Sequence, residues 1–126
     1  MPTDTNTALL QNILQDLNTH IDGLEQMAII RRDGTLLARF YSTEKGQSAK
    51  QIFAEFAALT DEVRQILDRG SNTEAIIKGQ HRFLAIYRTH GTNTILGIVG
   101  QASVNLGLLN SGSRMAIEKI ETIITE

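Results

Sequence analysis

The chain has 126 residues, which suits one domain, and 41% of them are hydrophobic, as in typical globular proteins. It contains no cysteine, which excludes a disulfide framework, a thiolate metal site and a cysteine nucleophile. With 12 basic and 14 acidic residues, the formal net charge is −2, so there is no basic surplus for binding nucleic acid. No apolar run approaches the roughly 20 residues of a membrane span, and the N-terminus lacks a secretory pattern, so we expect a cytoplasmic protein.

The N-terminal segment predicts an amphipathic helix. Asp4 or Thr5 is suited to cap its start, and Gly23 is placed to end it. Aliphatic residues recur at spacings of three and four, which defines the buried face: Leu9, Leu10, Ile13, Leu14 and Leu17.

Two short strands are predicted next, at Met27 to Arg31 and at Leu36 to Tyr41. Between them lies Asp33-Gly34, a pair that accepts positive φ and is among the strongest short signals for a hairpin. We therefore expect these strands to pair in antiparallel fashion.

The longest helix is predicted from about Ser48, a good capping residue, to Arg69, with Gly70 after its end. Its apolar stripe is formed by Ala49, Ile52, Phe53, Phe56, Leu59, Val63, Ile66 and Leu67. Small and polar residues form a row opposite this stripe: Ala54, Ala58, Asp61 and Gln65. Two alanines one turn apart on an outer face would let a second helix approach closely.

Three more strands are predicted at Thr73 to Lys78, Arg82 to Arg88 and Asn93 to Val99, with glycine-containing turns between them. The last two are apolar on both faces, so we expect helices to cover both faces of the sheet. The first is short and has charged residues around an apolar centre: Glu74, Ala75, Ile76, Ile77 and Lys78. If it is an edge strand, its free backbone groups can pair with another chain.

The final helix is predicted from near Asn105, a good cap, to about Thr125. Its buried face is formed by Leu109, Ala116, Ile117, Ile120, Ile123 and Ile124. Gly112 and Ser113 lie on the same face and allow two interpretations. They permit close approach to another element, or they weaken and bend the first turns.

The sequence contains no recognisable catalytic constellation. The histidines are placed at a helix end and in two predicted turns, without metal-ligand spacing: His20, His81 and His90. The stretch from Gly107 to Arg114 has the glycine spacing of a phosphate loop, but Ser113 stands where that loop needs lysine. We predict no catalytic residue, no cofactor and no metal site.

The element order αββαβββα, together with three stretches of sequence, resembles the Roadblock/dynein light chain domain family over about Leu9 to Ile124. The stretches are Gly23 through Ile30, Arg31 through Ala38, and Asn105-Leu106-Gly107-Leu108-Leu109. The resemblance implies an α/β (α+β) fold of the profilin-like sandwich type. Its five-stranded antiparallel sheet has the order 2-1-5-4-3, with one helix on one face and two on the other. Longin and profilin domains have related architectures.

The resemblance also implies function. Members dimerise through the third strand and the second helix, so the candidate dimer interface here comprises Ala54, Ala58, Asp61, Gln65, Glu74, Ala75, Ile76, Ile77 and Lys78. Members regulate Ras-like and Rag-type GTPases or act as adaptors on dynein. The chain looks most like bacterial and archaeal members, which are often encoded with a small GTPase and can stimulate its GTP hydrolysis.

We therefore expect a single Roadblock-like domain over residues 1–126, with an ordered core from about 7 to 125. It would act as a non-catalytic, homodimeric regulatory or scaffold module that binds a small GTPase. None of the arginines is assigned to a partner's nucleotide, although several are available: Arg31, Arg32, Arg64, Arg69 and Arg114. The alternative is a small-ligand sensor or adaptor domain of similar architecture, and a sensor needs an apolar pocket between sheet and helices. The bulky residues Phe40, Phe53, Phe56 and Phe83 favour a filled core instead.

Overall fold

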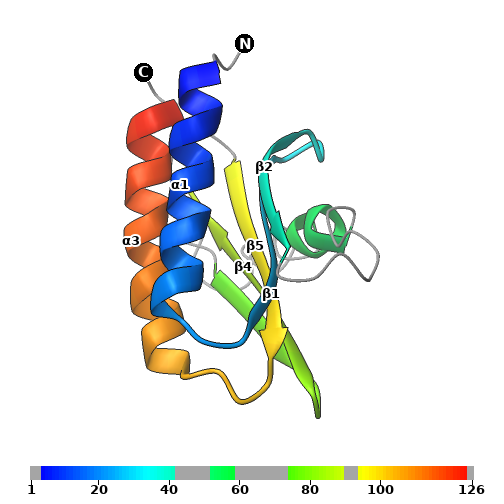
Figure 1. Ribbon diagram of the computed structural model, residues 1–126. Coiled ribbons are helices and arrows are strands. Elements are labelled where there is room, and N and C mark those ends of the chain that lie inside the picture. The colour runs from blue at the N-terminus through cyan, green and yellow to red at the C-terminus, as the bar shows by residue number, and fades with distance from the viewer. Residues whose placement is uncertain (1–3, 42–51, 59–73, 90–93, 125–126) are drawn as a thin grey trace.

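The computed structural model describes residues 4–41, 52–58, 74–89 and 94–124 (Figure 1). In chain order these form α1 (Asp4–His20), β1 (Leu24–Arg31), β2 (Leu36–Tyr41), a helical segment at 52–58, β3 (Glu74–Lys78), β4 (Arg82–Arg88), β5 (Thr94–Gln101) and α3 (Leu106–Ile124). This is the predicted order αββαβββα. Of the long helix expected from Ser48 to Arg69, only 52–58 is described, so Asp61 and Gln65 lie outside the described residues.

The strands form one antiparallel sheet in the order β2-β1-β5-β4-β3, which confirms the predicted topology. Helices α1 and α3 lie side by side on one face, and the 52–58 segment lies on the other (Figure 1). The bounds of β2 and β4 are the predicted ones. β1 begins at Leu24 rather than Met27 because Leu24 pairs with Gly100 at the far end of β5.

The sheet has a core on each face, as strands apolar on both sides require. Alternation along β1 sends Ile29 toward α1 and α3, and sends Ala28 and Ile30 toward the 52–58 segment. In β4, Tyr87 belongs to the first core and Ile86 to the second. Helices on both faces are therefore needed to keep this sheet out of water.

The β1–β2 hairpin is closed by Asp33-Gly34, as predicted. Gly34 has φ of 95°, a conformation that residues with a side chain rarely adopt. The Asp33 carboxylate accepts hydrogen bonds from the Thr35 hydroxyl at 2.7 Å and the Thr35 amide at 2.9 Å. These bonds, led by the one from the hydroxyl, lower the pKa of Asp33 below its ordinary value.

The 52–58 segment is held on the sheet by Phe53, which is 1% exposed. Its ring lies directly over Gly97 of β5, where an added Cβ would overlap the Cγ atom of Phe53. Gly97 pairs with Ala28 of β1 and Ile86 of β4, so the ring sits on the middle strand of the sheet. The absence of a side chain at position 97 creates the space that the aromatic ring fills.

Two residues predicted to lie on buried helix faces are exposed. Leu9 is 43% exposed and Ile52 is 53% exposed. In α1 the buried face is centred on Leu10 and Leu14, which leaves Leu9 at its margin. In the 52–58 segment the buried pair is Phe53 and Ala57, which leaves Ile52 on the outer side of the segment.

Helix α3 begins where it was predicted to begin. Asn105 precedes it, and the Asn105 side-chain oxygen accepts a hydrogen bond from the Leu108 amide at 3.0 Å, the geometry of an N-cap. An added Cβ at Gly112 would lie 3.1 Å from Ile21 Cδ1 and 3.5 Å from Leu17 Cδ2. Gly112 therefore permits close approach of α3 to the end of α1, which is the first of its two predicted interpretations.

Candidate functional site

Strand β3 is one edge of the sheet. Among the described strands it pairs only with β4, in a register that runs from Glu74 opposite Tyr87 to Lys78 opposite Phe83. Its outer side therefore carries backbone donors and acceptors that no described strand uses. An edge of this kind is a template for adding a strand from another chain.

The two faces of β3 differ in what they contact. Ile76 packs on the core beneath α1 and α3, and Ala75 packs on the core beneath the 52–58 segment. Ile77, on the same face as Ala75, is 57% exposed. A large apolar side chain thus lies in water beside an open edge, on the side of the sheet where the 52–58 segment packs.

The side chain of Glu74 is engaged in an ion pair within the chain. Arg114 of α3 donates from Nε to Glu74 Oε2 at 2.7 Å and from Nη2 to Glu74 Oε1 at 2.8 Å. One turn earlier on α3, Asn110 Oδ1 accepts a 2.8 Å hydrogen bond from the buried Tyr87 hydroxyl. Burial is the main cause that raises the pKa of Tyr87 to about 12. Together these contacts fasten α3 over β3 and β4.

The two alanines predicted to face outward are placed differently. Ala54 is half-buried against the core between the sheet and the 52–58 segment, and Ala58 is also half-buried. Because Phe53 and Ala57 define the inner face, the exposed residues of this segment are Ile52 and Glu55. Ala54 and Ala58 lie on the flanks of the segment, and their role in a dimer stays a prediction.

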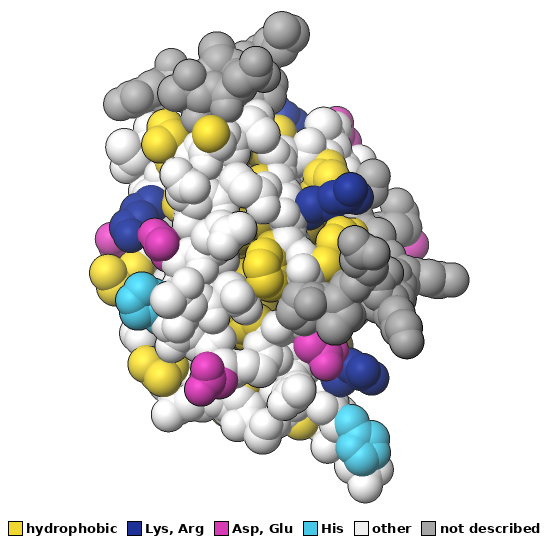
Figure 2. Space-filling model, viewed as in Figure 1, with side chains coloured by type: hydrophobic (Ala, Val, Ile, Leu, Met, Phe, Trp, Pro, Cys, Tyr) yellow, Lys and Arg dark blue, Asp and Glu magenta, His cyan; other side chains and the backbone are white. Residues whose placement is uncertain are grey.

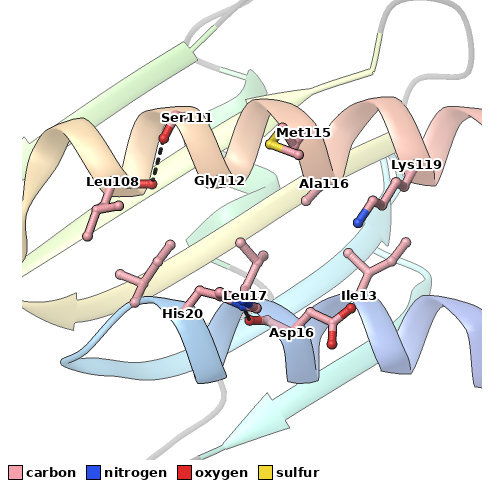
Figure 3. Close-up of a pocket in the computed structure, with 11 residues that line it drawn as sticks. Ile13, Asp16, Leu17, His20, Leu108, Ser111, Gly112, Met115, Ala116 and Lys119 are labelled. Atoms are coloured by element: carbon pink, nitrogen blue, oxygen red, sulfur yellow. Dashed lines mark hydrogen bonds between the residues drawn. The ribbon is translucent and has the colours of Figure 1, made fainter.

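A second surface feature is a groove between α1 and α3, with a volume of about 350 Å³ (Figure 3). It is lined by Ile13, Asp16, Leu17, His20, Ile21, Leu108, Ser111, Gly112, Met115, Ala116 and Lys119. The groove lies between two helices, whereas the sensor alternative needs a pocket between sheet and helices. Between the sheet and the helices, Phe53, Phe83 and Tyr87 are fully buried in packed cores.

The groove was not predicted from the sequence. Its signal was nevertheless present, since Leu108 and Met115 lie seven residues apart on α3 and off the predicted buried face. Residues at that spacing share one face of a helix. Two exposed apolar residues on such a face indicate a surface that is only partly covered.

The groups considered for chemistry are dispersed. His20 and His81 are exposed, and His20 Nδ1–H donates to the Asp16 backbone oxygen at 2.8 Å; His90 lies outside the described residues. Among residues 4–41, 52–58, 74–89 and 94–124, no cluster of three metal-ligating side chains occurs. Gly107 and Gly112 both lie within α3 and not in a phosphate-binding loop.

Within the same ranges, no helix is long and apolar enough to cross a membrane.

Arg114 and Arg82 are engaged in ion pairs. Arg114 binds Glu74, and Arg82 Nε donates to Glu25 Oε1 at 2.7 Å, which joins β4 to β1 across the end of the sheet. Arg31 is exposed beside the hairpin turn. The arginines at 64 and 69 lie outside the described residues.

Comparison with solved structures defines the class of this fold. A Roadblock/LC7 domain from Streptomyces avermitilis has a TM-score of 0.76 and 14% identity, over 92% of this chain and 98% of that one. The protein therefore has the Roadblock/LC7 fold, as the sequence resemblance implied.

The gliding protein MglB is a more particular neighbour. MglB from Thermus thermophilus has a TM-score of 0.83 and 17% identity, over 96% of this chain and 92% of that one. A structure described as MglB with tetrameric arrangement gives the same score and identity, over 96% and 91% of the two chains. The sequence itself matches no protein-family model and no curated protein.

Proposed function

We propose that this protein is a non-catalytic, homodimeric regulatory or scaffold module that binds a small Ras-like GTPase and modulates its GTP hydrolysis or its localisation. The observation that carries the proposal is the agreement with MglB in backbone over 96% of the chain, at a TM-score of 0.83. The family resemblance of the sequence supports the GTPase as partner. A scaffold of this kind acts by binding, so it requires no nucleophile, metal or cofactor of its own.

Self-association through β3 is supported by three features of that strand. Its outer backbone edge is open, Ile77 is exposed beside it, and Glu74 is held in place by Arg114. Antiparallel pairing of β3 with its copy would satisfy the open backbone groups and cover Ile77. One MglB structure has a tetrameric arrangement, which supports self-association in proteins of this fold.

The oligomeric state tests this part of the proposal. We expect a dimer in sedimentation equilibrium at tens of micromolar, and we expect Ile77→Asp to shift it toward monomer by placing a charge at the pairing edge. The matched control is Leu36→Asp, because Leu36 is also exposed but lies on β2 at the opposite edge. A wild-type chain that remains strictly monomeric would contradict homodimerisation.

The GTPase is tested separately. The immobilised protein is incubated with lysate of its source cell containing either a non-hydrolysable GTP analogue or GDP, and retained proteins are identified by mass spectrometry. We expect a small GTPase that is enriched in the GTP-analogue sample. Phosphate release by that purified GTPase, with and without this protein, then separates activation from recruitment. Recovery of no GTPase in either nucleotide state would overturn this part of the proposal.

A further inference from the structure

The groove between α1 and α3 is hollow because small residues line it. Ser111, Gly112 and Ala116 of α3 stand opposite Ile13 and Leu17 of α1. Gly112 brings the two helices together without supplying a side chain to fill the space above their contact. The resulting floor is apolar, and a partner helix could approach it closely.

Exposed apolar side chains border this floor. Leu108 is 50% exposed and Met115 is 59% exposed, both from the groove side of α3. Their separation of seven residues is two helical turns, or roughly 10 Å. Figure 2 shows hydrophobic side chains along the left margin, over the helical layer, next to basic, acidic and histidine side chains. An apolar strip of this length matches the i and i+7 anchors of an amphipathic helix.

Opposite charges stand on the two walls at one end of the groove. Asp16 projects from α1 and Lys119 from α3, and Lys119 reaches toward α1 (Figure 3). Within the described parts of the chain, neither the Asp16 carboxylate nor the Lys119 ammonium has an ionic partner. Each charge is thus available to a ligand lying between the walls.

We propose that this groove binds an amphipathic α-helix of a partner protein. The helix carries a stripe of Leu, Ile or Met, with basic residues on the flank facing Asp16 and acidic residues on the flank facing Lys119. A helix suits the site because it satisfies its own backbone, and the walls, themselves helices, offer no open backbone edge. The two charges also set the polarity of the bound helix, since reversing it would bring like charges together.

The groove lies apart from the β3 edge, the surface proposed for self-association. The groove is formed by α1 and α3 on one face of the sheet, while the 52–58 segment lies on the other face (Figure 1). The open backbone edge of β3 lies at the side of the sheet. A helix bound in the groove would therefore leave the β3 edge free. The protein would then bind a partner helix in the groove and a second copy of itself at β3 at the same time.

The test uses stapled helical peptides about five turns long, with Leu, Ile, Met or Phe at the anchor positions. Every peptide is made with the proposed arrangement of Lys and Glu on its flanks and with the reversed arrangement. Binding is read from the protein's methionine methyl groups by NMR. The chain has three methionines, of which Met115 lines the groove and Met27 is buried in the core as an internal reference.

We expect the Met115 methyl signal to shift on titration while the Met27 signal does not. Met115→Lys, monitored by fluorescence anisotropy, should weaken binding on the order of tenfold or more. The matched control Leu106→Lys changes an exposed leucine of the same helix that does not line the groove, and it should bind normally. The double variant Asp16→Lys with Lys119→Asp should prefer the peptides with reversed flanks.

Three results would overturn the proposal. The first is that no peptide of the set binds at several hundred micromolar. The second is that both flank arrangements bind equally, which would indicate an unspecific apolar site. The third is that Met115→Lys lowers the mass of the protein in sedimentation, because the groove would then be a contact between copies. The two peptide measurements involve neither a GTPase nor the β3 edge, so they fail or succeed independently of the proposed function. The sedimentation result separates a groove that binds a partner helix from one that joins two copies of this chain.

Discussion

The guanidinium of Arg114 binds both carboxylate oxygens of Glu74, at 2.7 and 2.8 Å, and thereby joins α3 to the edge strand β3. Hydrogen bonding to Glu74 raises the pKa of Arg114 above its ordinary value. The pair fixes the edge strand from the side of the helical layer. Glu74 can therefore take part in a dimer through its backbone while its side chain remains in this contact.

A double-mutant cycle on this pair should reveal a modest coupling. The two side chains are 59% and 30% exposed, and an ion pair that water reaches this easily stabilises a fold only slightly. We expect Arg114→Ala and Glu74→Ala each to lower the free energy of urea unfolding, and the double variant to be little worse than either. Arg114→Lys should restore only part of the loss because lysine cannot make both hydrogen bonds. Strict additivity of the single effects would show that the pair contributes nothing.

The Tyr87 phenol should titrate with a pKa of about 12. Burial disfavours the phenolate, so the folded pKa exceeds the ordinary value of 10. The corresponding stability is fully present below pH 10 and is lost as the pH rises through about 12. Tyrosinate absorbance is measured in a Tyr41→Phe background, where Tyr87 is the remaining one of two tyrosines. A midpoint near 10 would show that the hydroxyl reaches water.

Gly97→Ala should destabilise the fold by about 1–3 kcal/mol, because the new methyl group overlaps the ring of Phe53. Phe53→Leu alone is also expected to be destabilising. Combined with Gly97→Ala, it should cost less than the sum of the two single changes, since the smaller side chain leaves space for the methyl group. Urea unfolding of the four proteins measures this coupling. If the two effects simply add, the ring does not lie over Gly97 in solution.

Asn105→Ala should lower the stability by about 1 kcal/mol through loss of the cap on α3. Asn105→Ser serves as the matched control, because a serine hydroxyl can accept the same hydrogen bond from the Leu108 amide. Thermal unfolding compares the three proteins. Equal melting temperatures for wild type and Asn105→Ala would show that this cap is dispensable.

Local features were predictable because the groups that make them lie close together in the chain. The Asp33-Gly34 turn rests on bonds to Thr35, and the α3 cap joins Asn105 to Leu108. The strand order and the placement of helices on both faces also followed from the sequence. Apolar residues on both sides of β4 and β5 require cover on both faces, and the family resemblance supplied the topology.

What only the tertiary structure decided depends on contacts between distant segments. The spacing of apolar residues did not show which way the 52–58 segment turns, because the position of Phe53 is set by a missing side chain at Gly97 in another strand. In the same way, the spacing of residues did not assign a partner to Arg114, because Glu74 comes within reach only when α3 packs on the sheet beside β3. The sequence by itself determined the hairpin turn at Asp33-Gly34 and the start of α3 at Asn105, since both use neighbouring residues. The start of β1 at Leu24 depended instead on pairing with Gly100 in β5. The groove forms only when α1 packs against α3, and the ion pair of Arg114 with Glu74 forms only when α3 packs against β3.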